Sequence, residues 1–175
     1  MSITLKIFAM AGGIFFLIAP LSGFSAGTRP ETRLQEPQVC NGFEQSIDFQ
    51  LQDLNNSTYM LSSYRGKRPV ILLFWTTWCP MCREGIKKLN AMYPQLVKDD
   101  FEVLSINVRE QEAKVFSFVK SNSLAFKILL DKTGNTAKDY GLVGIPTYII
   151  IDKEGCVRFR DHFLPQDELK AMVAK

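Results

Sequence analysis

The sequence predicts a single α/β domain with a mixed β-sheet flanked by helices. Short apolar runs of strand length alternate along the chain with segments whose apolar residues recur at helical spacing. The run at 70–75 contains only Val, Ile, Leu, Phe and Trp, which is typical of a central strand buried on both faces. Near the C-terminus a hairpin turn joins two strands into an antiparallel pair, and a last helix follows them.

The length of the chain favours one domain with a hydrophobic core, and its charge argues against nucleic acid as a partner. Its 175 residues suffice for one domain with a hydrophobic core. The formal net charge is +3 with no basic stripe, so nucleic acid is not an expected partner. Four cysteines and one histidine are present, but the second CxxC or HxxxH pair of a zinc site is absent from the sequence. We therefore expect no metal and no cofactor.

Residues 1–26 are predicted to be a signal peptide or an N-terminal membrane anchor. Lys6 is the only charged residue before Arg29, and an apolar run followed by small residues lies between them. Cleavage after Ser25 or Ala26 fits a secretory signal, but the uncharged stretch is also just long enough to cross a bilayer. Both alternatives stay open. Either one places the remaining chain in the periplasm or on the extracytoplasmic face of a membrane, where cysteine pairs persist as disulfides.

The other elements are predicted in chain order. Residues 27–39 are polar with two prolines and predict a linker, which leaves 40–175 as the folded domain. Alternation at 47–51 and a returning strand at 59–61 predict an N-terminal β-hairpin. After the central strand we expect a helix to about Lys98, then a strand at 101–108, a helix at 110–120, a strand at 126–130, a short helix ending at 141, strands at 147–151 and 156–160, and a helix at 166–173.

A cysteine pair, Cys79 and Cys82, lies where the central strand gives way to helical spacing. Such a junction places the first thiol at a helix N-terminus, where partial positive charge and free N–H groups favour a thiolate. Thiolate is the species that attacks disulfides and binds electrophiles. The pair is therefore the candidate reactive site of the chain.

These residues, taken with a later motif, resemble the thioredoxin superfamily. The resemblance rests on the segments 78–82, 144–147 and 149–155, which read WCPMC, GIPT and IIIDKEG. The leading hairpin and the segment 61–67 are more similar to the exported, often membrane-tethered TlpA/ResA/CcmG branch. The likeness covers the chain from about Phe43 onward. It implies a thioredoxin fold with an extra N-terminal β-hairpin.

The resemblance also implies a protein-disulfide oxidoreductase. In such proteins Cys79 would be the nucleophile, Cys82 the resolving cysteine, and Pro146 a cis proline beside them; an ordinary trans proline at a strand entry is the alternative. The residues expected to line the partner groove are Trp78, Pro80, Met81, Ile145 and Pro146. The usual direction in this branch is reduction of partner disulfides, such as those of apocytochrome c, with electrons from a membrane thiol transporter.

Two positions near the second cysteine depart from the family pattern. Thioredoxins carry a buried acid six residues before the first cysteine, where this chain has Leu73. The ResA-type branch often has a glutamate three residues after the second cysteine, where this chain has Gly85. Glu84 is adjacent, but neighbours on a helix are rotated by about 100°, so we interpret it as a solvated first-turn acid. The proton acceptor for Cys82 stays open.

Cys40 and Cys156 lie outside the reactive motif, and we expect them to form a structural disulfide in an oxidising compartment. The chain-entropy model assigns about 4–5 kcal/mol to closing so long a loop. Two free thiols, or Cys40 as a third redox cysteine, are the alternatives. His162 is expected at the surface or a sheet edge without a catalytic role.

Three other functions compete with the reductase. A thiol oxidant is the first, because the Pro-Met dipeptide between the cysteines does not fix the reduction potential. A thiol peroxidase is the second: Thr76 stands three residues before Cys79, as in the PxxxTxxC pattern of peroxiredoxins, but Leu72 replaces the proline. A non-catalytic interaction module is the third.

Overall fold

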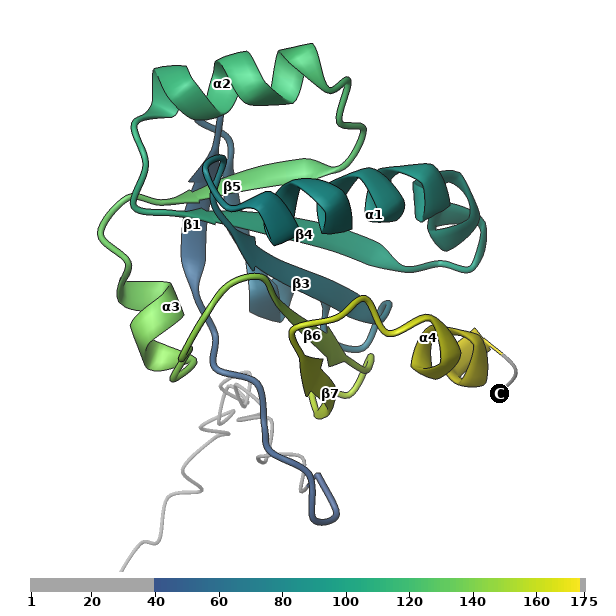
Figure 1. Cartoon of the computed structure of the whole chain (residues 1–175). Helices are drawn as coiled ribbons and strands as arrows, with labels where there is room; N and C mark the ends of the chain where they lie inside the picture. The colour runs from purple at the N-terminus through teal and green to yellow at the C-terminus, as the bar shows by residue number, and fades with distance from the viewer. Residues whose placement is uncertain (1–39, 174–175) are drawn as a thin grey trace, which may run out of the picture. The chain divides into compact units, whose positions relative to one another are not determined.

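The computed structural model describes residues 40–173, so the predicted leader at 1–26 and the predicted linker at 27–39 lie outside the described residues. The described part forms one seven-stranded sheet with the strand order β2-β1-β5-β4-β3-β6-β7 (Figure 1). The strands are β1 (Gln50–Asp53), β2 (Thr58–Met60), β3 (Val70–Trp75), β4 (Glu102–Val108), β5 (Lys127–Asp131), β6 (Thr147–Ile151) and β7 (Val157–Asp161). The helices are η1 (Leu61–Tyr64), α1 (Pro80–Lys98), α2 (Glu112–Ser121), α3 (Asn135–Asp139) and α4 (Gln166–Val173).

The sheet is mixed, as predicted, and β3 lies at its centre. β3 pairs in parallel with β4 and antiparallel with β6, and all its residues are buried. The predicted hairpin is present as β1 and β2, but it starts three residues later than predicted, at Gln50. Before that point Asp48 accepts a hydrogen bond from the backbone N–H of Ser62 instead of lying in a ladder. β1 also pairs antiparallel with β5, so the hairpin extends the main sheet.

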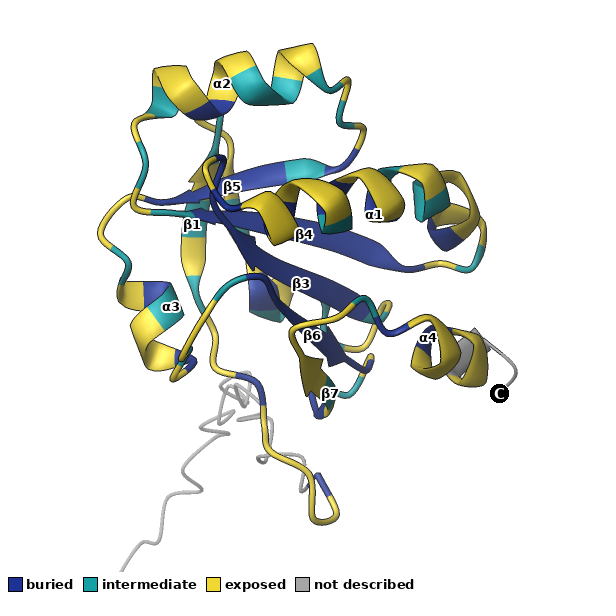
Figure 2. Cartoon of the chain, viewed as in Figure 1, coloured by how far each residue is buried: buried dark blue, intermediate teal, exposed yellow. Residues whose placement is uncertain are grey.

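Two cores cover the two faces of the sheet, because successive residues of each strand point to opposite faces. On one face, residues such as Leu73 and Ile150 pack against Ile86 of α1, Val115 of α2 and Leu169 of α4. On the other face, Phe74 belongs to a second cluster with residues of η1 and α3. Figure 2 shows the result: β3 and β4 are buried, and the helices bury one side and expose the other.

The helix α1 carries the cysteine pair and ends at Lys98, as predicted. It continues across Pro94, so this proline does not end it. Among the described residues no helix is long and apolar enough to span a membrane.

Candidate functional site

The first turn of α1 holds both cysteines in different environments. Cys79 is the N-cap residue, and its Sγ accepts a hydrogen bond from the backbone N–H of Cys82 at 3.2 Å. Pro80 occupies the first position of the helix, where its missing N–H would have had no helical partner. Cys79 is 6% exposed and Cys82 is 0% exposed, so only the first residue of the pair keeps any contact with the surface. A helix N-terminus with a donor on the sulfur is an arrangement that stabilises a thiolate at Cys79.

Cys82 is held in its neutral form. Burial raises the pKa of the Cys82 thiol to about 12, and the hydrogen bond with the Cys79 side chain acts in the same direction. The thiol is therefore protonated at neutral pH. Both cysteines are free and buried in this structure, and Cys79 keeps a small exposed area where Cys82 has none.

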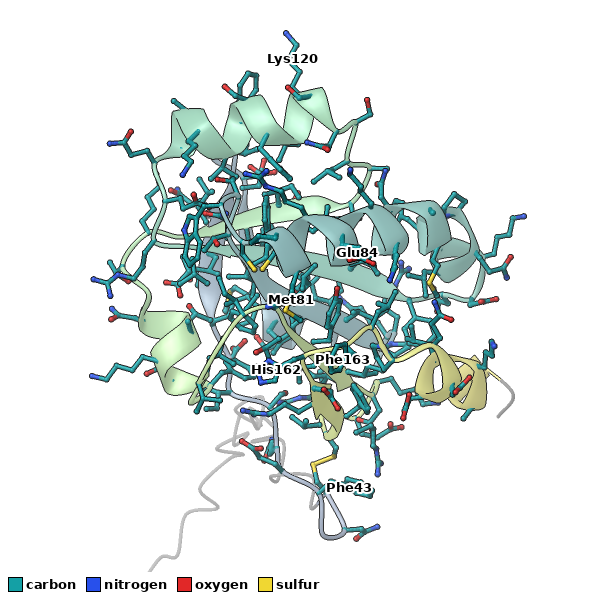
Figure 3. The ribbon with its side chains drawn as sticks, viewed as in Figure 1. Phe43, Met81, Glu84, Lys120, His162 and Phe163 are labelled. Atoms are coloured by element: carbon teal, nitrogen blue, oxygen red, sulfur yellow. A yellow bond between two sulfur atoms is a disulfide. The ribbon has the colours of Figure 1, made fainter. Side chains whose placement is uncertain are left out.

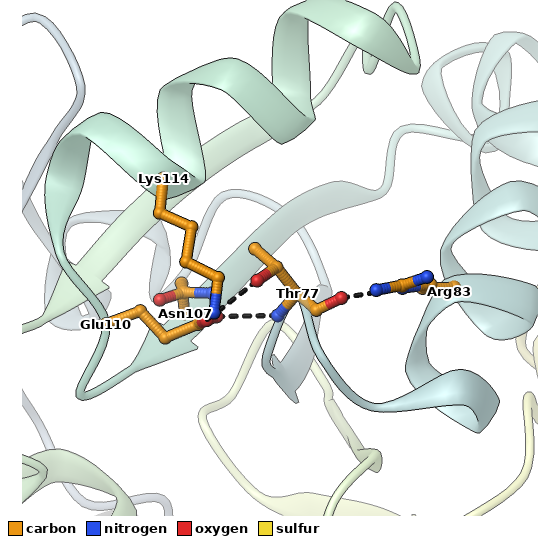
Figure 4. Close-up of polar contacts among 5 residues, drawn as sticks. All are labelled: Thr77, Arg83, Asn107, Glu110 and Lys114. Carbon is orange, nitrogen blue, oxygen red and sulfur yellow. Dashed lines mark hydrogen bonds and ion pairs between the residues drawn. The ribbon is translucent and has the colours of Figure 1, made fainter.

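The loop that leads into the cysteines is fixed by a buried carboxylate (Figure 4). Glu110 accepts hydrogen bonds from the backbone N–H of Thr77 at 2.6 Å and from its hydroxyl at 2.7 Å. Asn107 donates to the same carboxylate at 2.8 Å, and Lys114 forms an ion pair with it at 2.9 Å. Arg83 of α1 donates from Nε to the carbonyl oxygen of Thr77 at 2.7 Å. The loop is therefore tied both to the helix that follows it and to the end of β4.

The charge of Glu110 is stabilised despite its burial. Its side chain is 5% exposed, and burial alone would raise its pKa. The hydrogen bonds from Asn107, Thr77 and Lys114 outweigh burial and hold the pKa below its ordinary value. Sequence reasoning missed this residue. The available signal was its place just after β4, since parallel neighbours β3 and β4 end at the same edge of the sheet.

The Ile145–Pro146 peptide bond is cis and lies beside Cys79. The Cys79 sulfur is 3.8 Å from the carbonyl oxygen of Ile145 and can donate to it as a thiol. His162, after β7, lies behind this loop with Nδ1 2.7 Å from the carbonyl oxygen of Pro146. Because a carbonyl only accepts, Nδ1 carries the proton. His162 is exposed, as expected, but its contact with the proline loop was not predicted from the sequence.

A cavity of about 230 Å³ opens next to the cysteine pair, between the start of α1, the proline loop and the segment after β7. The cavity is lined by, among others, Met81, Gly85, Pro146, Tyr148, His162 and Phe163. Met81 and Phe163 are exposed apolar side chains, and Figure 3 shows them grouped with His162. An apolar rim around an accessible sulfur suits contact with a polypeptide segment.

The other residues singled out from the sequence lie at different distances from the cysteine pair. Trp78 is exposed next to Cys79, and Glu84 forms an exposed ion pair with Lys88 at 2.7 Å, which fits a solvated first-turn acid. Cys40 and Cys156 are joined by a disulfide at the start of β7, away from the reactive pair (Figure 3). No group of three His, Cys, Asp or Glu side chains placed to hold a metal ion occurs within residues 40–173.

Comparison with known proteins places the chain in a family. The sequence model of the AhpC/TSA family matches residues 44–160, which is more than half of the chain. The chain belongs to the AhpC/TSA family. Within that family its similarity is to thiol-disulfide oxidoreductases: the protein named ResA from Geobacillus thermodenitrificans is 38% identical over 111 residues, which are 63% of this chain and 63% of that protein. The chain thus spans less than two thirds of the length of such curated relatives.

Solved structures agree with the family. A protein from Chlorobium tepidum described as a thiol:disulfide interchange protein DsbE has a TM-score of 0.68 and 26% identity, and the match covers 76% of this chain and 97% of that one. StoA from Bacillus subtilis has a TM-score of 0.62 and 26% identity over 74% of this chain and 97% of that one. The predicted thioredoxin fold and the resemblance to the ResA branch are confirmed.

Proposed function

We propose that this protein is a thiol-disulfide oxidoreductase that exchanges disulfides with partner proteins through Cys79 and Cys82. The observation that carries the proposal is the placement of the two sulfurs. The Cys79 sulfur is at the start of α1 and 3.8 Å from the carbonyl oxygen that precedes Pro146, and Cys82 is enclosed one turn behind it. The names of the ResA and DsbE relatives support the same activity.

In the first step, the Cys79 thiolate attacks one sulfur of a partner disulfide. A bond forms between Cys79 and that sulfur, the partner disulfide breaks, and the second partner sulfur leaves with the electron pair as a thiolate. The N–H of Cys82 and the positive end of α1 stabilise the attacking charge. An extended partner segment can align beside Ile145, since the adjacent Pro146 has no N–H and the exposed Met81 and Phe163 offer apolar contacts.

In the second step, Cys82 loses its proton and attacks the Cys79 sulfur of the mixed disulfide. The Cys79–Cys82 bond forms, the bond to the partner breaks, and the partner sulfur leaves as a thiolate that takes up a proton. Both partner sulfurs are then reduced, and the protein holds the disulfide. Because Cys82 is fully buried, a partner can reach Cys79 but not the resolving sulfur.

The proposal includes a location and a direction. We place the protein outside the cytoplasm, as a reductase of exported proteins such as apocytochrome c, reduced again by a membrane thiol transporter. The apolar N-terminal segment and the Cys40–Cys156 disulfide support an oxidising compartment. The resemblance to the TlpA/ResA/CcmG branch, in which reduction is the usual direction, supports this direction.

A trapping experiment tests the activity. The reduced protein is mixed with a disulfide-linked peptide, quenched with acid and analysed by mass spectrometry. We expect the Cys82→Ser variant to accumulate a Cys79–peptide mixed disulfide, the Cys79→Ser variant to form none, and the wild-type protein to release reduced peptide. Absence of a mixed disulfide in the Cys82→Ser variant would contradict the proposal. Rapid consumption of hydrogen peroxide that survives the loss of Cys82 would favour a peroxidase instead.

A further inference from the structure

Tyr148 of β6 carries a buried hydroxyl that has no hydrogen-bond partner among residues 40–173. The residue is 1% exposed, so solvent does not supply a partner at its surface. Buried hydroxyls in folded proteins are nearly always hydrogen-bonded, because a buried polar group without a partner is unfavourable. A hydroxyl left in this condition points to a partner that becomes available in another state of the protein.

The position of Tyr148 relates it to the cysteine pair. Tyr148 is directly opposite Leu73 in the antiparallel ladder between β6 and β3, so both side chains leave the sheet on the same face. That face is covered by α1, and Leu73, Tyr148, Cys79 and Cys82 belong to one buried cluster. Position 73 is where the resemblance to thioredoxins led us to expect a buried acid.

The hydroxyl also reaches the second position where an acid was expected. A Cβ atom built on Gly85 would lie 2.1 Å from the Tyr148 oxygen, which is well inside contact distance. The same atom would lie 3.4 Å from Cζ of the tyrosine ring, which is an ordinary contact. The absence of a side chain at Gly85 therefore leaves space for the Tyr148 hydroxyl. This hydroxyl is the polar group that lies between positions 73 and 85.

The charges around this hydroxyl make it a donor and not a base. Burial raises the pKa of Tyr148, and negative charge on Cys82 or Cys79 raises it further, so the phenol keeps its proton when a thiolate forms nearby. The other titratable groups of the adjoining cavity are Glu84, Lys88 and His162. The first two are paired with each other at the surface, and the Nδ1 proton of His162 is held by the proline loop.

We propose that Tyr148 donates a hydrogen bond to the sulfur of Cys82 when that sulfur is a thiolate, and so supports the resolving step in the place of the missing acids. The inference rests on the proposed function. Cys82 gives its proton to solvent, and its thiolate, held by the Tyr148 hydroxyl, attacks the Cys79 sulfur of the mixed disulfide. The electron pair leaves with the partner sulfur, which takes up a proton from water. The hydroxyl keeps its own proton throughout.

The test separates the two steps of the exchange. Reduced protein is mixed rapidly with the disulfide-linked peptide, and the mixed disulfide is followed by acid quench and mass spectrometry at neutral pH. In Tyr148→Phe we expect an unchanged rate of formation and an about tenfold slower decay, since a hydrogen bond to a charged group changes an equilibrium by roughly that factor or more. Tyr140→Phe is the matched control: its buried hydroxyl donates to Ile47 at 2.7 Å on the opposite face of the sheet, and its decay rate should equal that of the wild type.

A second variant displaces the hydroxyl without removing it. Gly85→Ala introduces the Cβ that clashes with the Tyr148 oxygen, so we expect a slower decay here too. In the double variant Gly85→Ala with Tyr148→Phe no hydroxyl remains to be displaced, and the decay should be no slower than in Tyr148→Phe alone. A wild-type decay rate in Tyr148→Phe would overturn the inference. If the Cys82→Ser variant traps no mixed disulfide, the proposed function fails first, and the inference fails with it.

Discussion

The two cysteine pairs of this domain differ in how they are held in place. Cys40 and Cys156 are joined by a disulfide that closes a sequence separation of 116 residues, and both are buried. Cys79 and Cys82 are three residues apart at a helix start and are also buried, but they are free thiols. The first pair restricts the unfolded chain, and the second lies at a helix N-terminus, where we propose that it attacks disulfides. The position of a pair in the fold, rather than its sulfur chemistry alone, decides which role it takes.

The largest expected effect that distinguishes the two cysteine pairs is the loss of disulfide exchange. Cys79→Ser should reduce no disulfide peptide above background, because the attacking sulfur is gone. The double variant Cys40→Ala with Cys156→Ala should exchange at the wild-type rate, since its cysteines lie away from the site. Release of reduced peptide, measured by mass spectrometry, checks both. Loss of exchange in a folded variant without Cys40 and Cys156 would show that the pairs are not independent.

The second effect concerns stability. The same double variant should lower the free energy of unfolding by about 4–5 kcal/mol in the chain-entropy model. Urea denaturation of the variant and of the wild-type protein, with the cysteines of the reactive pair reduced in both, measures the difference. A change of less than about 1 kcal/mol would mean that the disulfide is not a main support of the fold.

A smaller effect is expected at the carboxylate that fixes the reactive loop. Glu110→Gln places an amide N–H₂ among donors that face the carboxylate, so we expect a loss of about 2 kcal/mol in unfolding free energy. Glu112→Gln, which removes an exposed ion pair with Lys132, is the matched control and should cost less than about 1 kcal/mol. Equal losses in the two variants, measured by urea denaturation, would contradict the role given to Glu110.

The smallest effect is the pH dependence of the reduced protein over the first pH unit above 9.0. The pKa of Cys82 is raised in the fold from 9.0 to about 12, so folding favours the neutral thiol. This contribution to stability is complete below pH 9.0 and is lost as the pH rises toward 12, at about 1.4 kcal/mol per pH unit. The oxidised protein has no such titration. Urea midpoints of both forms should therefore diverge above pH 9.0, with the reduced form less stable; parallel curves would contradict the enclosure of Cys82.

Much of this fold was predictable because its signals are local. The apolar run of β3 and the helical spacing after Cys82 follow from period and burial alone. The end of α1 at Lys98 was predicted in the same way. The pairing of β1 with β5 was not, because the two strands are far apart in sequence and register is a tertiary property.

The two cysteines of the site could be predicted from the sequence, but the residues that surround them could not. The spacing of Cys79 and Cys82 is visible in the sequence, and so is the departure from the family pattern at Gly85. A side chain at position 85 would collide with the Tyr148 hydroxyl, which reaches Gly85 only through the register of β6 against β3. Glu110 likewise acts on the loop at Thr77 across 33 residues of sequence. Such contacts require the folded sheet.

The reduction potential of the Cys79–Cys82 pair tests the central claim most directly. The protein is equilibrated with graded ratios of reduced and oxidised glutathione, alkylated, and mapped by mass spectrometry so that each cysteine is followed separately. The account predicts a Cys79–Cys82 potential close to that of thioredoxin, about −270 mV, with Cys40–Cys156 still joined. A Cys79–Cys82 potential near about −120 mV, as in DsbA, would contradict a reductase and make this protein a thiol oxidant.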